Sequence, residues 1–168
     1  IFVTALLHDI GMLVIFMHKR NDYSELLRKI SLNEKSLIDL EQDSYGFNHQ
    51  QVGSALINKW RLPDSISEPI NYHHNHESAP ESNQKTAKIL YFADQLSAIY
   101  NETDTAEKVR LLQGKLEGYY SLNPDQIRIL LDDVAKKSVE ILKAFEIDPG
   151  AIKPYSQMLQ EANEELGR

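Results

Sequence analysis

The chain has 168 residues, enough for one well-cored domain and too few for two of ordinary size. Its formal net charge of −7 argues against a nucleic-acid partner, and the absence of cysteine excludes disulfides and thiolate zinc sites. Because no basic segment precedes the first apolar run to mark a signal peptide, we expect a cytoplasmic protein.

The first predicted helix runs from Ile1 to about Lys19 and is apolar on nearly every side. Such a helix is either buried or in a membrane. A membrane span is the poorer interpretation, because the run is short and carries Asp9 at its middle. We therefore expect no membrane association and place His8 and Asp9 inside a protein core, where the carboxylate needs a partner.

Apolar residues recur at helical spacing along the rest of the chain, and glycine and proline are few. The predicted fold class is therefore all-α. Caps and breaks divide the sequence after the first helix into further helices at about 23–30, 35–45, 48–60, 63–74, 84–100, 107–120, 123–145 and 154–166. The clearest loop between them is 75–83.

The helix after Asn48 is predicted to point His49 toward the core. Asn48 followed by Gln51 is the pattern of a capping box, which marks a helix start. From there one stripe contains His49, Val52, Gly53, Leu56, Ile57 and Trp60. We expect Trp60 to be a core anchor, and we assign His18 and His76 to the surface.

Four helices thus each bring a histidine or aspartate to a position predicted to face inward: His8, Asp9, His49, His73, His74 and Asp94. Imidazole and carboxylate are ligands of zinc, iron, manganese or nickel, and an aspartate can bridge two ions. The prediction is a divalent transition-metal site with one or two ions.

Each of these residues also has a structural interpretation without metal. His49 can be a hydrogen-bonded core histidine, and His73 and His74 can cap the C-terminus of their helix. Asp94 can pair with Lys85 or Lys88 on the surface of its own helix.

The ordered motifs resemble the HDOD family, the HD-related output domain of bacterial signalling proteins and a relative of the HD-GYP and HD phosphohydrolases. The matching segments are Ala5–Gly11 (ALLHDIG), Tyr45–Gly53 (YGFNHQQVG), Trp60–Pro63 (WRLP), Tyr72–His74 (YHH) and Phe92–Asp94 (FAD). The resemblance implies an all-helical HD-type bundle. In its hydrolytic relatives the residues matching His8, Asp9 and Asp94 hold one metal, and those matching Asp9, His49, His73 and His74 complete a second site.

Three departures from the family pattern bear on function. Relatives use a further ligand well upstream of His-Asp, whereas only seven residues precede His8 here. The Gly-Tyr-Pro stretch of cyclic-di-GMP phosphodiesterases is replaced by residues 75–80 (NHESAP), which argues against hydrolysis of that nucleotide. The N-terminal helical half of an HDOD domain is also missing, so we expect the chain to be part of something larger.

Residues 1–150 are therefore predicted to form the HDOD-like domain, and residues 151–168 a helix that leads to a further signalling module. We expect Tyr155 and Met158 in this helix to pack on the domain. The preferred function is a regulatory output domain that has a metal site and contacts other signalling proteins. One alternative is a metal-dependent phosphohydrolase acting on a nucleotide or cyclic dinucleotide, with Asp9 catalytic and a phosphorylated small molecule as its partner. Another is a purely structural bundle.

Overall fold

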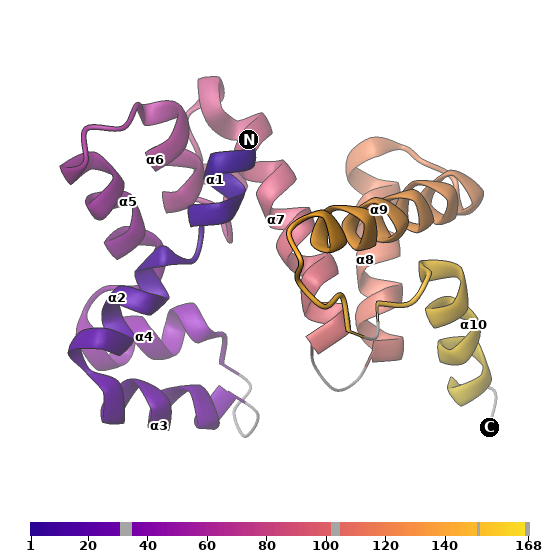
Figure 1. The fold of residues 1–168 in the computed structure, drawn as a ribbon, viewed down its shortest axis with the longest axis horizontal. Helices are drawn as coiled ribbons and strands as arrows, with labels where there is room; N and C mark the ends of the chain where they lie inside the picture. Colours follow the sequence, from indigo (N-terminus) through magenta and orange to yellow (C-terminus); the bar gives the residue numbers. More distant parts are fainter. Residues whose placement is uncertain (31–34, 102–104, 151, 167–168) are drawn as a thin grey trace. The chain divides into compact units, whose positions relative to one another are not determined.

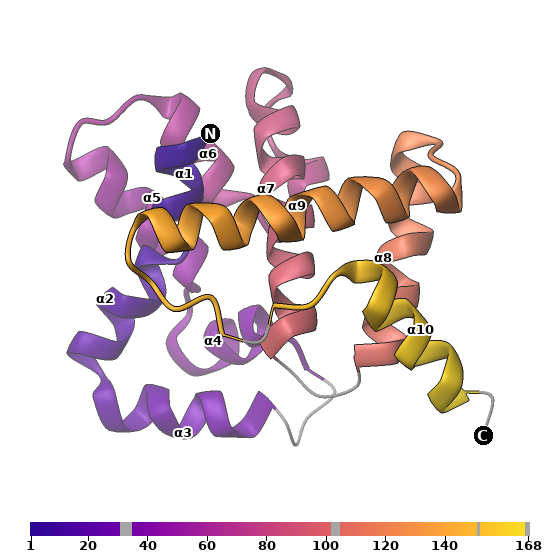
Figure 2. The ribbon, with the colours of Figure 1, turned by 45° about the vertical axis from the view of Figure 1, so that its right-hand side comes forward.

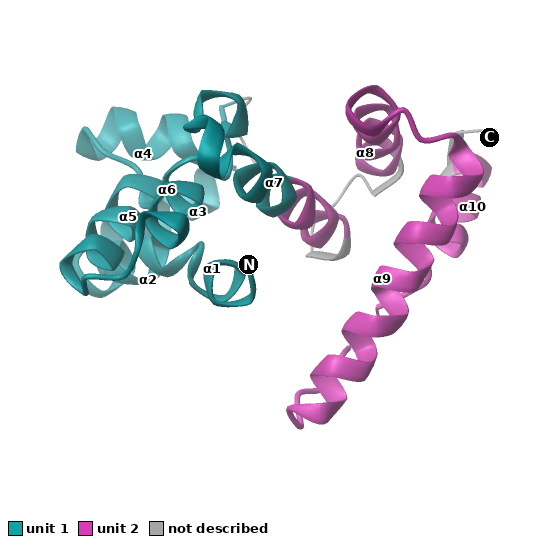
Figure 3. Cartoon of the chain, turned by 90° about the horizontal axis from the view of Figure 1, so that it is seen from above, with its two compact units in different colours: residues 1–91 teal, residues 92–168 magenta. Residues whose placement is uncertain are grey.

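The structure, a computed structural model, describes residues 1–30, 35–101, 105–150 and 152–166. Within these ranges every regular element is a helix, which confirms the predicted all-α class. The chain forms two compact units, residues 1–91 and 92–168 (Figure 3). The predicted functional division at residue 150 stays a prediction. None of the described helices has both the length and the hydrophobicity that a membrane span requires.

The first unit contains α1 (Phe2–Leu7), α2 (Ile10–His18), α3 (Arg20–Ile30), α4 (Leu37–Tyr45), α5 (His49–Lys59), α6 (Asp64–Asn71), the short 3₁₀ helix η1 (His76–Ser78) and the first part of α7 (Glu81–Asn101). Helix α5 packs against both α2 and α6. Helices α3 and α4 lie at one end of this unit, and α1 and α6 lie at the other (Figures 1 and 2). Helices α2 and α5 therefore connect the two ends.

The core of the first unit follows the helical periodicity of the sequence. Ile15, Tyr23 and Leu26 form a buried cluster at the end where α2, α3 and α4 meet. Between α5 and α6, Ile57 and Ile70 are fully buried. Burial of these side chains anchors the helices that carry the histidines, because a fully buried Ile or Leu contributes about 1.5–3 kcal/mol.

The prediction of one unbroken helix from Ile1 to Lys19 is wrong. The chain leaves helical hydrogen bonding at His8 and Asp9, between α1 and α2. The expectation that this whole run is buried is also wrong, since Phe2 is 66%, Leu6 72% and Met17 71% exposed. Two short helices at different angles present only part of their surface to the unit, so the remaining apolar side chains face outward.

The local start and stop signals of the sequence are largely confirmed. Gly46 ends α4 in the left-handed conformation with φ 76°, and Asn48 and Gln51 form the predicted capping box of α5. The predicted loop 75–83 is shorter than expected, because η1 forms within it and α7 begins at Glu81.

The second unit contains the rest of α7, α8 (Thr105–Tyr120), α9 (Pro124–Ala144) and α10 (Tyr155–Leu166). Helix α10 packs against α8 and α9. Its Tyr155 is 1% and its Met158 4% exposed, which confirms the predicted packing of this helix. The second unit therefore has a core of its own.

Candidate metal centre

His8 and Asp9 occupy the break between α1 and α2, and the nearby Gly11 brings this break close to α5. A Cβ atom on Gly11 would overlap the backbone carbonyl of His49 and would lie 2.8 Å from the backbone nitrogen of Gly53. Only a glycine permits so close a helix crossing. The Asp9-Ile-Gly11 sequence therefore places the Asp9 carboxylate beside the first turn of α5, where His49 lies.

His49 is held at the start of α5 by the cap that precedes it. The Asn48 side chain accepts a hydrogen bond from the Gln51 backbone N–H, and the Gln51 side chain accepts one from the Asn48 N–H. This capping box fixes where the helix begins, and His49 becomes its first residue. Its side chain is 1% exposed, so the predicted inward orientation is confirmed.

His73 and His74 follow the C-terminal end of α6. Tyr72 caps this helix, and its backbone N–H donates to the carbonyls of Glu68 and Pro69. The chain then turns, and the two adjacent imidazole rings lie with their centroids 4.1 Å apart and their planes inclined by 43°. His73 is fully buried, and His74 is partly buried.

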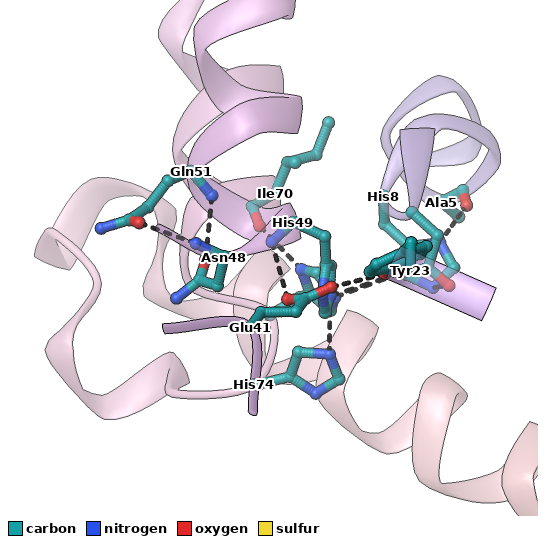
Figure 4. A network of polar contacts seen from close by, with 11 residues as sticks. Ala5, His8, Tyr23, Glu41, Asn48, His49, Gln51, Ile70 and His74 are labelled. Carbon is teal, nitrogen blue, oxygen red and sulfur yellow. Dashed lines mark hydrogen bonds and ion pairs between the residues drawn. The ribbon is translucent and has the colours of Figure 1, made fainter. Parts of the chain in front are cut away.

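The side chains of these three segments meet at Asp9. Its Oδ2 lies 3.1 Å from Nε2 of His8, and its Oδ1 lies 3.5 Å from Nε2 of His73 and 3.8 Å from Nε2 of His49. Nε2 of His74 lies 3.2 Å from Nε2 of His49 (Figure 4). Within the described residues, Asp9, His49, His73 and His74 each offer a ligand atom, and these atoms all lie within 4.8 Å of one another.

In three of these histidines the second ring nitrogen, Nδ1, is hydrogen-bonded to an oxygen, and this bond determines the tautomer. Nδ1 of His8 is 2.7 Å from the Ala5 carbonyl oxygen, and Nδ1 of His73 is 2.7 Å from that of Ile70. Nδ1 of His49 is 2.7 Å from Oε2 of Glu41. Because oxygens of this kind accept, each Nδ1 donates a hydrogen, and in the neutral ring Nε2 carries the lone pair. In each of these rings the nitrogen nearest Asp9 is therefore the one that can bind a metal ion.

Glu41 was not among the residues predicted for the site. It lies on α4 and is 0% exposed, and it accepts hydrogen bonds from the Tyr23 hydroxyl and from His49 (Figure 4). The sequence carried a signal for it, because Glu41 falls four residues after Leu37 and four before Tyr45, on the inward stripe of its helix. A carboxylate on such a stripe needs a buried partner.

The environment of Asp9 favours its charged form. Burial acts to raise the pKa of this carboxyl, but the rings of His73 and His8, when protonated, donate hydrogen bonds and place positive charge beside it, which outweighs burial and holds the pKa far below its usual value. For His74 the net effect is also downward: burial, together with the neighbouring His73 and His49 rings, lowers its pKa to about 3. A carboxylate and a neutral imidazole are the forms that bind a metal ion.

The donor set fits a divalent cation. Nε2 of His73 is buried and has no hydrogen-bond partner, although it faces the Asp9 carboxylate. Two acceptors that face each other repel unless a proton or a metal ion lies between them. Zinc binds imidazole nitrogen and carboxylate oxygen at about 2.0–2.2 Å, so ligand atoms this close together can share one ion.

The remaining predicted residues are Asp94, His18, His76 and Trp60, and two of them differ from the prediction in burial. Asp94 is on α7 in the second unit and is partly buried, and its metal role stays a prediction. His18 is exposed as predicted. The surface assignment of His76 is wrong, since it is 3% exposed and its ring packs edge-on against Tyr91. The core assignment of Trp60 is also wrong, because it ends α5 and is 51% exposed.

Comparison with known proteins supports the resemblance seen in the motifs. Residues 1–76 match the HDOD domain family, a segment that includes His8, Asp9, His49, His73 and His74. The chain is also 27% identical over 99 residues to an uncharacterized protein of Treponema pallidum (strain Nichols), an alignment that covers 55% of this chain and 18% of that protein. The chain thus spans less than a fifth of the length of this relative. No solved structure matches the chain.

Proposed function

We propose that the HDOD domain at residues 1–76 is a signal-transduction module that binds a divalent transition metal and acts through contacts with other signalling proteins. Asp9, His49, His73 and His74 would hold the ion, and His8 would orient Asp9. The observation that carries the proposal is the convergence of imidazole Nε2 atoms on one carboxylate, with Nδ1 of His8, His49 and His73 each engaged by an oxygen.

The donor types favour zinc, iron, manganese or nickel over calcium and magnesium. Imidazole nitrogen suits the first group, whereas calcium and magnesium prefer oxygen ligands. The single carboxylate of the group leaves too few oxygens for these hard cations. Selection within the first group is a matter of geometry and availability.

The motif segments favour a regulatory role over catalysis. Of the five segments that match the family, only Trp60–Pro63 contains a lysine or an arginine, Arg61. Phosphoryl-transfer enzymes commonly use such cationic groups to stabilise charge on the reacting phosphate. A metal ion here would therefore serve to fix the arrangement of α2, α5 and the turn after α6.

One observation keeps a metal-dependent phosphohydrolase as a second candidate. The Asp9 side chain is 43% exposed, so an ion bound to it would be reachable by water and by a phosphorylated small molecule. A bound transition metal lowers the pKa of a coordinated water and so supplies hydroxide. In that case Asp9 would be the central ligand of the reaction site.

Elemental analysis of protein purified without chelator tests the proposal. We expect close to one or two transition-metal ions per chain in the wild type and a loss of this metal in Asp9→Ala. His18→Ala is the control, because His18 is an exposed histidine on α2 outside the cluster. The proposal is wrong if the wild-type protein is metal-free and also fails to bind zinc, iron, manganese or nickel on titration. The interpretation as a purely structural bundle would then remain.

A second assay separates regulation from catalysis. The metal-loaded protein is incubated with a general phosphodiester and with a panel of nucleotides and cyclic nucleotides, in the presence of manganese or iron. We expect no turnover above that of Asp9→Ala. Turnover that disappears in Asp9→Ala but persists in His18→Ala would establish the phosphohydrolase instead.

A further inference from the structure

Glu41 is a carboxylate buried inside the first unit, away from solvent. It is 0% exposed, and its described hydrogen-bond donors are Tyr23 and His49, which are each 1% exposed. Burying a carboxylate costs several kcal/mol or more unless hydrogen bonds and opposite charge compensate it. Neither donor is a permanent cation. A protonated ring or a bound ion would supply the compensating charge.

The two oxygens of Glu41 are divided between two helices. Oε1 accepts a hydrogen bond from the Tyr23 hydroxyl on α3. Oε2 accepts two from His49 on α5, at 2.9 Å from the backbone nitrogen and 2.7 Å from Nδ1. The backbone N–H groups in the first turn of a helix have no partner within the helix. Glu41 therefore fixes both the helix start and the ring of the same residue.

His49 differs in this respect from the other two oriented histidines. Nδ1 of His8 and Nδ1 of His73 donate to neutral backbone carbonyls, whereas Nδ1 of His49 donates to a carboxylate. A carboxylate on the far side of an imidazole makes Nε2 a stronger metal ligand. Glu41 and Asp9 both lie against His49, so two negative charges flank a neutral imidazole. A divalent cation would neutralise these two charges.

We propose that Tyr23 and Glu41 form a positioning relay for the metal centre. The Tyr23 hydroxyl orients the Glu41 carboxylate, and Glu41 holds the Nδ1–H tautomer of His49 while adding charge that favours a divalent ion. This inference rests on the proposed metal site. It assigns to α3 and α4, which carry no ligand, a direct hydrogen-bonded connection to that site.

Zinc titration of the full chain tests the relay. Glu41→Gln keeps the shape and an acceptor oxygen but removes the charge, and we expect it to weaken zinc binding about 10- to 100-fold. Tyr23→Phe removes one hydrogen bond, and we expect it to weaken zinc binding about 2- to 10-fold. The controls are Glu25→Gln, an exposed carboxylate on α3, and Tyr45→Phe, a tyrosine packed against the same core. Both should bind zinc like the wild type.

Two further readouts separate positioning from general stability. If Glu41 and Tyr23 were purely structural, their substitution would lower the melting temperature equally in chelator and in zinc. If they position the metal centre, the increase in melting temperature that zinc produces should be smaller in the variants than in the wild type. Nitrogen NMR of the imidazoles should show the Nδ1–H tautomer of His49 in the wild type and a mixture in Glu41→Gln. If Glu41→Gln fails to fold, the zinc affinity and the His49 tautomer of Tyr23→Phe decide the matter.

The outcomes distinguish this inference from the proposed function. A wild-type chain that binds no zinc, manganese, iron or nickel removes the metal site itself. A wild type that binds zinc while folded Glu41→Gln and Tyr23→Phe bind it with unchanged affinity overturns the relay and leaves the metal site standing.

Discussion

Gly11 lies where α2 crosses the first turn of α5, and its missing side chain is what allows the crossing. Gly11→Ala would force a methyl group against the His49 carbonyl and the Gly53 nitrogen. We expect a loss of about 3 kcal/mol in the free energy of unfolding, at the upper end of overpacking, because two backbones must separate. Urea denaturation measures this loss, and zinc titration should show weaker binding as Asp9 moves away from His49.

Gly114 supplies the matched control for that substitution. It lies inside α8, and a Cβ atom there would have no neighbour within 4 Å. Gly114→Ala should therefore stabilise the chain by about 0.5–1 kcal/mol, the ordinary gain in a helix interior. An equal cost from both substitutions would contradict the close crossing at Gly11.

The depressed pKa of His74 predicts how metal-free protein responds to acid. Its pKa falls from 6.5 to about 3 on folding, so between these values the unfolded chain binds a proton that the folded chain does not. The contribution of neutral His74 to the free energy of unfolding is therefore fully present above pH 6.5 and decreases as the pH falls toward 3. The slope is at most about 1.4 kcal/mol per pH unit, and less because the ring is partly exposed.

Urea denaturation in chelator between pH 7 and pH 5 measures this slope. The range lies above the region where carboxyl groups titrate, so Asp9 does not contribute to it. His74→Gln should reduce the slope, and the exposed His18→Gln should leave it unchanged. A slope that is the same in His74→Gln and the wild type would contradict the assignment.

Helix α5 begins with the same capping box as α9, which allows the function of one cap to be compared with that of the other. Asn48 and Asn123 each accept a hydrogen bond from the residue three positions on, at 3.1 and 2.9 Å respectively. Each substitution to alanine should cost about 1 kcal/mol. Of the two, Asn48→Ala alone should also weaken zinc binding, because α5, unlike α9, begins with a proposed ligand. Equal zinc affinity in the two variants would show that the cap does not position His49.

The two units have separate cores, and the proposed metal ligands named above lie in the first of them. A ligand that binds only the folded state stabilises it by about 2.7 kcal/mol at 100 times its dissociation constant. Trp60, the single tryptophan of the chain, lies at the end of α5 and reports on the first unit. We therefore expect zinc to raise the melting temperature recorded by tryptophan fluorescence.

Hydrogen exchange shows whether this stabilisation is confined to the first unit. Amides of α2 to α6 should exchange more slowly with zinc, including those of α3 and α4 if the Tyr23–Glu41 relay operates. Amides of α9 and α10 should be unaffected. Uniform protection along the chain would instead indicate that zinc stabilises both units together.

Features that depend on neighbouring residues can be predicted from the sequence. Helical periodicity established the all-α class, the capping pattern located the start of α5, and the stripe after Asn48 turned His49 inward. The motifs also predicted the match of residues 1–76 to the HDOD family, because their residue types and order are specific even where each alone is common. The periodicity and the capping pattern are each read within a few helical turns.

Features that depend on distant segments follow from how the helices pack and cannot be predicted from local sequence. The break at His8 and Asp9 interrupts a run that is helical by local propensity, and it forms where α2 crosses α5 at Gly11. The burial of His76 and Glu41 and the exposure of Trp60 depend on which helices cover them. Periodicity indicates which face of a helix is apolar, but only packing between helices determines which residues of that face are covered, and hence which polar groups meet.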